Sequence, residues 1–211
     1  MRIGGFALET KRGSKSLHVG APGLRSDGEL AKVWVGQMQP HNAQITLVEY
    51  RPDWPSLFEK EADRVLHVLG DKALRIEHVG STSVPGLCAK PIIDMLLVVA
   101  DSAEESSYVP ALEAAGYILR IREPEWFGHR LFKGPDTDIN LHVFSAGVSE
   151  IEKMIGFRDW LSANEPDRDK YAEVKRSLAK STWRHIQHYA DAKTAIVEEI
   201  IERAKGNRKL T

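Results

Sequence analysis

The sequence contains one cysteine, Cys88, in 211 residues. A lone cysteine cannot close an intramolecular disulfide or supply a cysteine-based metal cluster, so we do not expect redox chemistry. Long apolar runs are also lacking: none could cross a bilayer, and residues 1–15 have no apolar stretch like that of a secretory signal peptide. These absences favour a soluble, cytoplasmic protein without a membrane partner.

Neither sign of charge is in excess. The sequence has 29 Lys and Arg residues against 30 Asp and Glu residues, which gives a formal net charge of −1. Such a chain has no overall electrostatic attraction to nucleic acid, so only a local basic patch would favour a nucleic-acid partner. A small-molecule partner is the default expectation.

Composition and periodicity divide the chain into three parts. Residues 1–44 are rich in Gly, Ser and Lys and carry six Lys or Arg residues against three acids, with no helical or alternating pattern before Val33. We expect a loosely structured N-terminal extension, which is either a plain tail or a tether for an acidic partner. Residues 45–205 form one predicted domain with a single core, and residues 206–211 form a C-terminal tail.

The pattern of apolar residues predicts an α+β fold. We expect strands at 45–48, 74–79, 92–99, 117–121, 130–133 and 139–144, a helix that begins at Trp54 with Asp53 as its cap, and another helix at 108–115. The strand at 92–99 is almost wholly apolar and should lie inside its sheet. From residue 149 onward only helical spacing is found. Together these patterns predict a mixed β-sheet with flanking helices and a C-terminal helical segment.

The most distinctive stretch is a short polar loop between two predicted strands, made of Gly80, Ser81, Thr82 and Ser83. Glycine lets backbone N–H groups approach an anion closely, the hydroxyls add donors, and Lys90 adds positive charge. Asp94 could hold Mg²⁺ against the same phosphates. The stretch therefore predicts a phosphate site. The alternative is a tight connection in which Asp94 accepts backbone N–H bonds from the loop.

Three residues further along the chain are candidates for the same site. His142 alternates with Leu141 and Val143, so it faces the other side of its strand, where it is either a base or ligand or a satisfied core histidine. His129 and Arg130 are suited to bind an anion, although Arg130 could instead pair with an acid such as Glu123 or Glu125.

The aromatic pair Trp126 and Phe127 comes just before His129. These rings could stack on a nucleobase, but aromatic side chains beside a strand are commonly part of the core. The sequence leaves both interpretations open.

Several motifs carry a resemblance to a known family: Gly80-Ser81-Thr82-Ser83-Val84-Pro85-Gly86 with Lys90-Pro91-Ile92-Ile93-Asp94, Trp126-Phe127-Gly128-His129-Arg130, and Leu141-His142-Val143-Phe144. Together they resemble the GrpB-like family, a branch of the nucleotidyltransferase-fold superfamily, over about residues 45–205. The resemblance implies a polymerase-β-like sheet, a nucleotide or other phosphorylated small molecule as ligand, and a domain that is also found fused to dephospho-CoA kinases.

The chain departs from the superfamily pattern in its acids. Asp94 fits the first of two alternating carboxylates, but Leu96 stands where the second would be, and the later strand offers Asn140 and His142 instead of an acid. Because two-metal transfer uses several carboxylates to hold its cations, two hypotheses follow. One is a nucleotidyltransferase-like enzyme with Asp94 and His142 as catalytic residues and Mg²⁺ on Asp94. The other is a non-catalytic module that binds a nucleotide or CoA.

Overall fold

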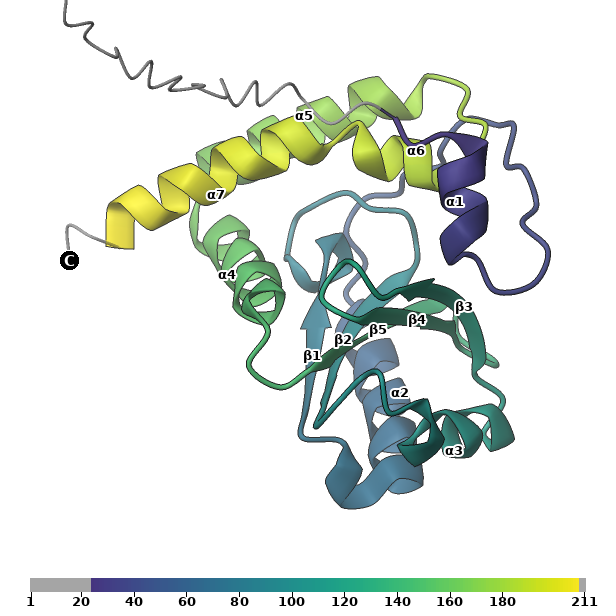
Figure 1. Cartoon of the computed structure of the whole chain (residues 1–211). Helices are drawn as coiled ribbons and strands as arrows, with labels where there is room; N and C mark the ends of the chain where they lie inside the picture. Colours follow the sequence, from purple (N-terminus) through teal and green to yellow (C-terminus); the bar gives the residue numbers. More distant parts are fainter. Residues whose placement is uncertain (1–23, 209–211) are drawn as a thin grey trace, which may run out of the picture.

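A mixed five-stranded sheet forms the centre of the protein, with helices on both faces and a further layer of helices beyond one end (Figure 1). The structure is a computed structural model that describes residues 24–208. Within these residues, no helix is both long and apolar enough to cross a membrane. The predicted α+β fold with a mixed sheet, flanking helices and a C-terminal helical segment is confirmed.

The strands lie in the order β1-β2-β5-β4-β3, and their bounds are β1 (Arg75–Val79), β2 (Ile93–Val99), β3 (Ile118–Glu123), β4 (His129–Lys133) and β5 (Ile139–Ser145). β2 and β5 run parallel, and every other neighbouring pair is antiparallel. β2 lies inside the sheet, between β1 and β5, as predicted. Its residues are almost all apolar because both of its faces are covered.

The predicted strand at 45–48 is wrong. Val48 forms only an isolated bridge with Ala89, with N···O distances of 2.9 Å in both directions. The nearby Ile45 N–H donates instead to the Ala179 carbonyl of a helix. Since the hydrogen bonds of this segment go to different elements, it cannot form a ladder with one neighbour.

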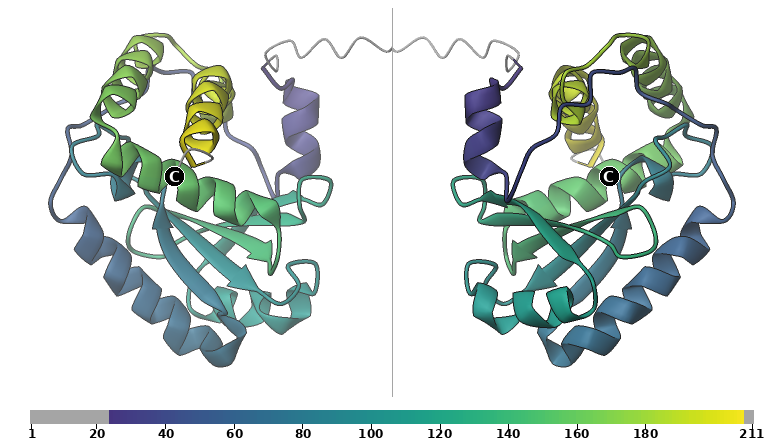
Figure 2. Two further views of the ribbon diagram at one scale, coloured as in Figure 1. Left: turned by 90° about the vertical axis from the view of Figure 1, so that its left-hand side faces the viewer. Right: turned by 90° about the vertical axis from the view of Figure 1, so that its right-hand side faces the viewer.

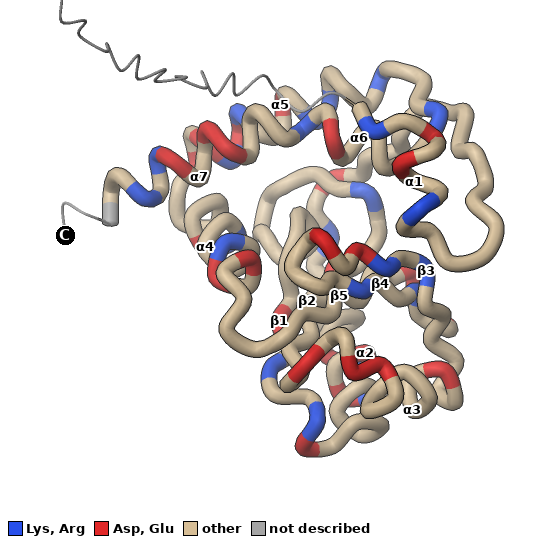
Figure 3. Tube along the Cα trace, viewed as in Figure 1, with Lys and Arg blue, Asp and Glu red and all other residues tan. Residues whose placement is uncertain are grey.

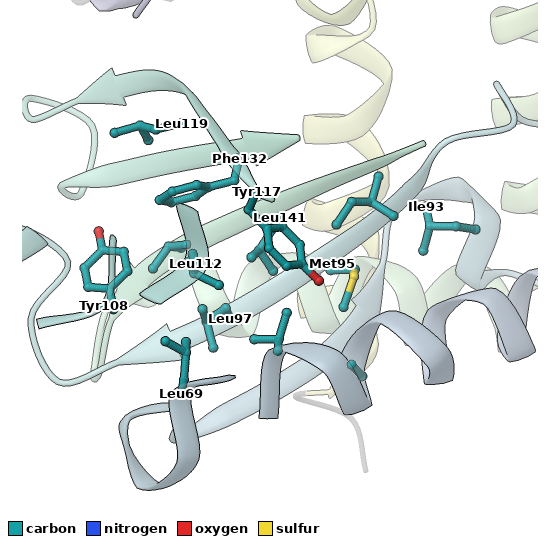
Figure 4. Close-up of a cluster of buried hydrophobic side chains, with 14 of the residues drawn as sticks. Leu69, Ile93, Met95, Leu97, Tyr108, Leu112, Tyr117, Leu119, Phe132 and Leu141 are labelled. Atoms are coloured by element: carbon teal, nitrogen blue, oxygen red, sulfur yellow. The ribbon is translucent and has the colours of Figure 1, made fainter. Parts of the chain in front are cut away.

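Two helices, α2 (Trp54–Leu69) and α3 (Val109–Ala114), cover one face of the sheet. The core between these helices and the sheet contains side chains from both, including Leu69 and Leu112 of the helices and Met95 and Phe132 of the strands (Figure 4). α2 begins at the predicted residue, but Asp53 makes no side-chain cap. Its carboxylate pairs with Arg51 instead, which leaves the first turn to be started by Pro55.

The helical segment consists of α4 (Ser149–Ala163), α5 (Glu165–Ala179), α6 (Ile186–Asp191) and α7 (Thr194–Arg208). α4 packs on the second face of the sheet through Ile151 and Ile155. A separate apolar cluster joins α5 and α7 to residues 84–88, the loop that follows the polar Gly80 turn, and contains Val84, Leu87, Cys88, Tyr171, Ala172, Ile196 and Ile200 among others. This cluster holds the helical layer next to that turn.

Part of the expected loose extension is folded. Residues 27–33 form helix α1 (Asp27–Val33), whose first turn is closed by a capping box between Ser26 and Glu29. Leu30 is buried, and α1 stands beside the helical layer on the β3 side of the sheet (Figure 2). The helix was not predicted because a capping box and a single buried leucine do not produce a repeating apolar pattern in the sequence. Residues 1–23 of the predicted extension lie outside the described residues.

Candidate functional site

The polar loop leaves β1 through Gly80, which has φ +69°, and continues as a turn of 3₁₀ helix over Ser81–Ser83. Thr82 is buried and its Oγ1 lies 3.0 Å from His78 Nε2, while the Ser83 hydroxyl donates to the Gly80 carbonyl at 2.6 Å. Both hydroxyls are thus engaged inside the loop. Ser81 lies beside the Tyr171 phenol of α5.

Asp94 stands at the start of β2, directly opposite Val79 on β1 and Asn140 on β5. Its Oδ1 accepts a hydrogen bond from Asn140 Nδ2 at 2.7 Å and lies 3.7 Å from His142 Nε2. Burial on its own would raise the pKa of Asp94, but His142, Asn140 and Lys90 lower it to about 2. The carboxylate is therefore ionised at neutral pH, and its partners are side chains of the sheet, not backbone N–H groups of the loop.

His142 and His129 form one hydrogen-bonded chain with acids at both ends. His129 Nδ1 lies 2.8 Å from Glu123 Oε2, His129 Nε2 lies 3.0 Å from His142 Nδ1, and His142 Nε2 faces Asp94. The strand register creates this row, since Glu123 pairs with His129 and His142 stands opposite Leu131, the next residue on the same face of β4. The sequence pointed to both histidines without showing that they touch.

The positions of the protons in this hydrogen-bonded chain follow from the groups at its two ends. Burial lowers the pKa of His129 to about 4 against the opposing effect of Glu123, so His129 is neutral at pH 7. Because the Glu123 carboxylate can only accept, His129 donates from Nδ1 and its Nε2 accepts from His142 Nδ1. Glu123 is held in turn by Arg25, whose Nη1 lies 2.7 Å from Glu123 Oε1. The chain fixes the ring of His142 with Nε2 toward Asp94.

Arg130 does not join this site. It follows His129 along β4 and faces the other side of the sheet, where it is buried. Its Nε donates to Glu105 Oε1 at 2.6 Å, and its Nη1 donates to the Gly128 carbonyl at 2.8 Å. The anion-binding prediction for Arg130 is therefore wrong, and its acid partner is neither of the two glutamates that the sequence suggested.

Three lysines meet near Asp94: the predicted Lys90, Lys175 of α5, and Lys193 in the turn between α6 and α7. The Nζ atoms of Lys90 and Lys193 lie 5.7 and 4.7 Å from the ring centroid of Tyr189. Lys175 is 2% exposed and donates to the Cys88 carbonyl. We refer to Lys90, Lys175 and Lys193 as the lysine cluster.

The lysine cluster is short of negative charge. Burial, reinforced by the nearby Lys193, lowers the pKa of Lys90 to about 8 and that of Lys175 to about 7, and burial also lowers the pKa of Lys193. Asp94 is the acid that opposes these shifts for all three lysines. α7, which follows Lys193, carries acidic as well as basic residues (Figure 3), so burial, rather than a basic surface, distinguishes this cluster.

Sequence reasoning missed Lys175 and Lys193, although a signal was present. Lys175 lies four residues after Tyr171, and Lys193 lies four residues after Tyr189. Each lysine thus stands about one helical turn after an aromatic residue, on the same stripe of the helical pattern. A lysine on such a stripe is rarely buried without a purpose, because lysine is among the residues least often found inside a protein.

No preformed metal centre accompanies Asp94. Across residues 24–208, no group of three or more His, Cys, Asp or Glu side chains is arranged so that it could hold a metal ion. Leu96, on the same face of β2, is fully buried in the apolar cluster under α4. Asp94 alone would supply a single ligand to Mg²⁺, and the other ligands would have to arrive with the bound molecule.

Comparison with known proteins places this fold in a family. The model of the GrpB protein family matches residues 44–203. A UPF0157 protein of Halalkalibacterium halodurans is 69% identical over 86% of this chain and 93% of its own length. The crystal structure of the conserved protein GrpB from Enterococcus faecalis is 32% identical and matches with a TM-score of 0.68 over 77% of this chain and 99% of that chain.

A more distant relative is a longer protein. A dephospho-CoA kinase of Mycolicibacterium paratuberculosis is 28% identical over 77% of this chain, and the match spans 46% of the kinase. The polar loop, the lysine cluster and the histidine chain all fall within residues 44–203, whereas Arg25 lies before them. Since the family model matches more than half of the sequence, the chain belongs to the GrpB family.

Proposed function

We propose that the protein binds a nucleotide or another phosphorylated small molecule beside Asp94, with its phosphates on the lysine cluster. The observation that carries this proposal is the imbalance of charge: three partly or fully buried ammonium groups have one carboxylate in common, Asp94, and Asp138 acts on Lys90 in addition. Desolvated charges are costly unless they are paired, and none of the three lysines forms an ion pair with a described residue. A multiply charged phosphate would supply the missing negative charge.

The surroundings of the cluster support an anionic ligand. The Tyr189 hydroxyl is buried and has no hydrogen-bond partner among the described residues. Buried hydroxyls are normally satisfied, so an unpaired one beside two lysines suggests a donor kept for a ligand oxygen. Ser81, at the start of the polar loop, adds a second hydroxyl beside Tyr171, and Lys175 Nζ lies 5.2 Å from the centroid of that tyrosine ring.

Catalysis is a second candidate function, and the histidine chain favours it. Glu123, His129 and His142 fix an imidazole nitrogen toward Asp94, which places a group suited to general acid–base catalysis beside the acid. In this version the protein transfers a nucleotidyl group, as the superfamily resemblance implies, with Asp94 and His142 as catalytic residues and Asp94 as the protein ligand of Mg²⁺. The non-catalytic alternative is favoured by Leu96, which takes the place of a second acid.

A thermal-shift panel tests the binding proposal. Its ligands are nucleoside triphosphates, CoA, dephospho-CoA and inorganic tripolyphosphate, each with and without Mg²⁺; the CoA compounds are included because of the kinase relative. A ligand at a hundred times its dissociation constant stabilises the folded state by about 2.7 kcal/mol, which raises the melting temperature. We expect this shift in the wild type and its loss in Lys193→Met.

The matched control is Lys180→Met, which changes an exposed lysine at the end of α5. The proposal fails if no ligand stabilises the wild type, or if Lys180→Met and Lys193→Met lose the shift to the same extent. Turnover is tested separately with Asp94→Asn. If the protein is an enzyme, this variant loses turnover and the Mg²⁺-dependent part of binding but keeps binding without metal.

A further inference from the structure

The turn between β3 and β4 presents two aromatic side chains to solvent. Trp126 is 39% exposed and Phe127 is 45% exposed, which sets them apart from the buried rings of the core. The interpretation of this pair as core residues is therefore wrong. We infer that Trp126 and Phe127 bind the planar heteroaromatic ring, the nucleobase, of the ligand whose phosphates occupy the lysine cluster, an inference that rests on the proposed function.

Trp126 is held firmly although one side of it is open. Its ring makes edge contacts with Phe127, His129 and Phe144, with centroid distances of 6.2, 4.8 and 5.5 Å. The turn itself is pinned by hydrogen bonds, among them His129 N–H to the Trp126 carbonyl at 3.0 Å and the Ser102 hydroxyl to the Gly128 carbonyl at 2.8 Å. A stacking surface that is rigid before binding loses little entropy when a ring is placed on it.

The backbone at Phe127 is strained. Its φ of +54° lies in the left-handed region, which large side chains rarely adopt. Such strain persists where the surrounding structure enforces it, and it is concentrated at binding and catalytic sites. Here the strained residue carries an exposed ring, so the strain does not serve to bury that ring. Its effect is to present Phe127 beside Trp126.

The pair is continuous with the proposed phosphate site. Trp126 contacts His129, whose ring is stacked at 5.2 Å on His142, and His142 Nε2 faces Asp94 Oδ1 at 3.7 Å. These residues lie on one face of the sheet and form a row that leads from the aromatic pair to Asp94 and the lysines. A molecule with a flat ring at one end and phosphates at the other matches this order of groups, and a nucleotide has that form.

Isothermal titration with two kinds of probe tests the inference. Adenosine and uridine triphosphates carry both a ring and phosphates, whereas inorganic tripolyphosphate carries phosphates alone. Stacking of a base on an aromatic side chain contributes enough that its removal weakens binding by about tenfold or more. We expect Trp126→Ala to weaken the triphosphates about tenfold and to leave tripolyphosphate unchanged, with Phe127→Ala showing a smaller loss of the same kind.

Two further variants keep the test decisive. Trp126→Phe retains a ring and should restore most of the nucleotide affinity, even if Trp126→Ala disturbs the neighbouring His129. Ile118→Ala is the matched control, because Ile118 is 47% exposed at the other end of the same hairpin and should change neither probe.

The outcomes separate the inference from the proposed function. If the wild type binds nucleotides no more tightly than tripolyphosphate, or if Trp126→Ala weakens both probes equally, the aromatic subsite is refuted and the phosphate site stands. If tripolyphosphate and nucleotides both fail to bind the wild type, the proposed function falls, and the inference falls with it.

Discussion

Gly80 packs directly against the side chain of Asp94. A Cβ atom added to Gly80 would lie 2.8 Å from the Asp94 Cβ and still closer to its carboxylate, so no other residue fits at this position without displacing Asp94. The turn out of β1 and the acid at the start of β2 therefore form one unit. The close approach explains why a glycine opens the polar loop, in addition to the left-handed backbone there.

Gly80→Ala should destabilise the protein for two reasons. Alanine is unfavourable at the positive φ of this position, and the added methyl group overpacks Asp94, which should cost about 1–3 kcal/mol more. The matched control is Gly147→Ala, since Gly147 has φ +82° but nothing within 4 Å of an added Cβ. We expect that control to cost about 1 kcal/mol. Urea denaturation of both variants measures the difference, and equal losses would show that the contact with Asp94 is not tight.

The lysine cluster should make the protein more stable as the pH rises above neutrality. The pKa of Lys175 is about 7 in the folded state and 10.5 when unperturbed, so between these values the unfolded state binds more protons. Stability should therefore rise with pH from about 7 toward 10.5, by up to about 1.4 kcal/mol per pH unit for one such group.

Lys175→Met should flatten this rise and leave the unliganded protein at least as stable as the wild type at pH 7. It removes a buried charge but keeps an unbranched side chain of similar length. Denaturation curves at pH 7, 8 and 9 provide the measurement, with Lys180→Met as the exposed control. An unchanged pH slope in Lys175→Met would contradict the assignment of a lowered pKa to this lysine.

Acid should destabilise the protein first through two histidines, the half-buried His78 and the buried His129. Burial lowers the pKa of His78 and of His129 to about 4, below the unperturbed value of 6.5. Between pH 6.5 and 4 the unfolded state takes up protons that the folded state does not, so stability falls as the pH falls through this window. The low pKa of Asp94, about 2, becomes important only below its ordinary value of 3.8.

His78→Gln isolates one of these groups. His78 stacks on Phe58 at 4.8 Å and contacts the Thr82 hydroxyl, and glutamine can keep the second contact without titrating. We expect the loss of stability between pH 6.5 and 4 to be smaller in this variant, as read from urea midpoints at half-unit steps. The same acid profile in both proteins would rule out His78 as a source.

Arg25 and Glu123 should show a measurable coupling. Arg25 is about one-third exposed, so a double-mutant cycle with Arg25→Met and Glu123→Gln should give about 1 kcal/mol or less for the pair. The single change Glu123→Gln should cost more than Arg25→Met, because glutamine has one acceptor oxygen for the two donors Arg25 and His129 and turns its own NH2 group toward one of them. Arg51→Met provides a control, since that ion pair is exposed on both sides.

The elements of the fold were largely predictable from local pattern. All five strands were predicted to within two residues of their ends, because apolar runs and their flanking turns define them locally. The strand at 45–48 failed because its hydrogen bonds depend on α5 and on Ala89, which are far away in the sequence. Helix α1 was missed because its one buried residue, Leu30, gives no periodic signal.

The site was predictable only in part, because its residues come from elements that lie far apart in the sequence. Asp94, His129 and His142 could be named because they stand on predicted strands, but their contacts depend on sheet order. Arg130 was misjudged because one step along a strand reverses the face, and its partner Glu105 lies in a different loop. The spacing of Lys175 and Lys193 from nearby tyrosines indicates burial, but only the packing of α5 and α7 against residues 84–88 brings these lysines to the site.

Arg25 joins two elements of the family domain although it lies outside the residues that define that domain. It binds Glu123 on β3 and Asp191 on α6 at the same time, and so links the sheet to the helical layer that carries Lys193. Yet it lies before the residues that the family model matches. A residue outside the family match thus holds two elements inside it together, so the loss of Arg25 would loosen the turn that carries Lys193 relative to the histidine chain without changing any residue of the site.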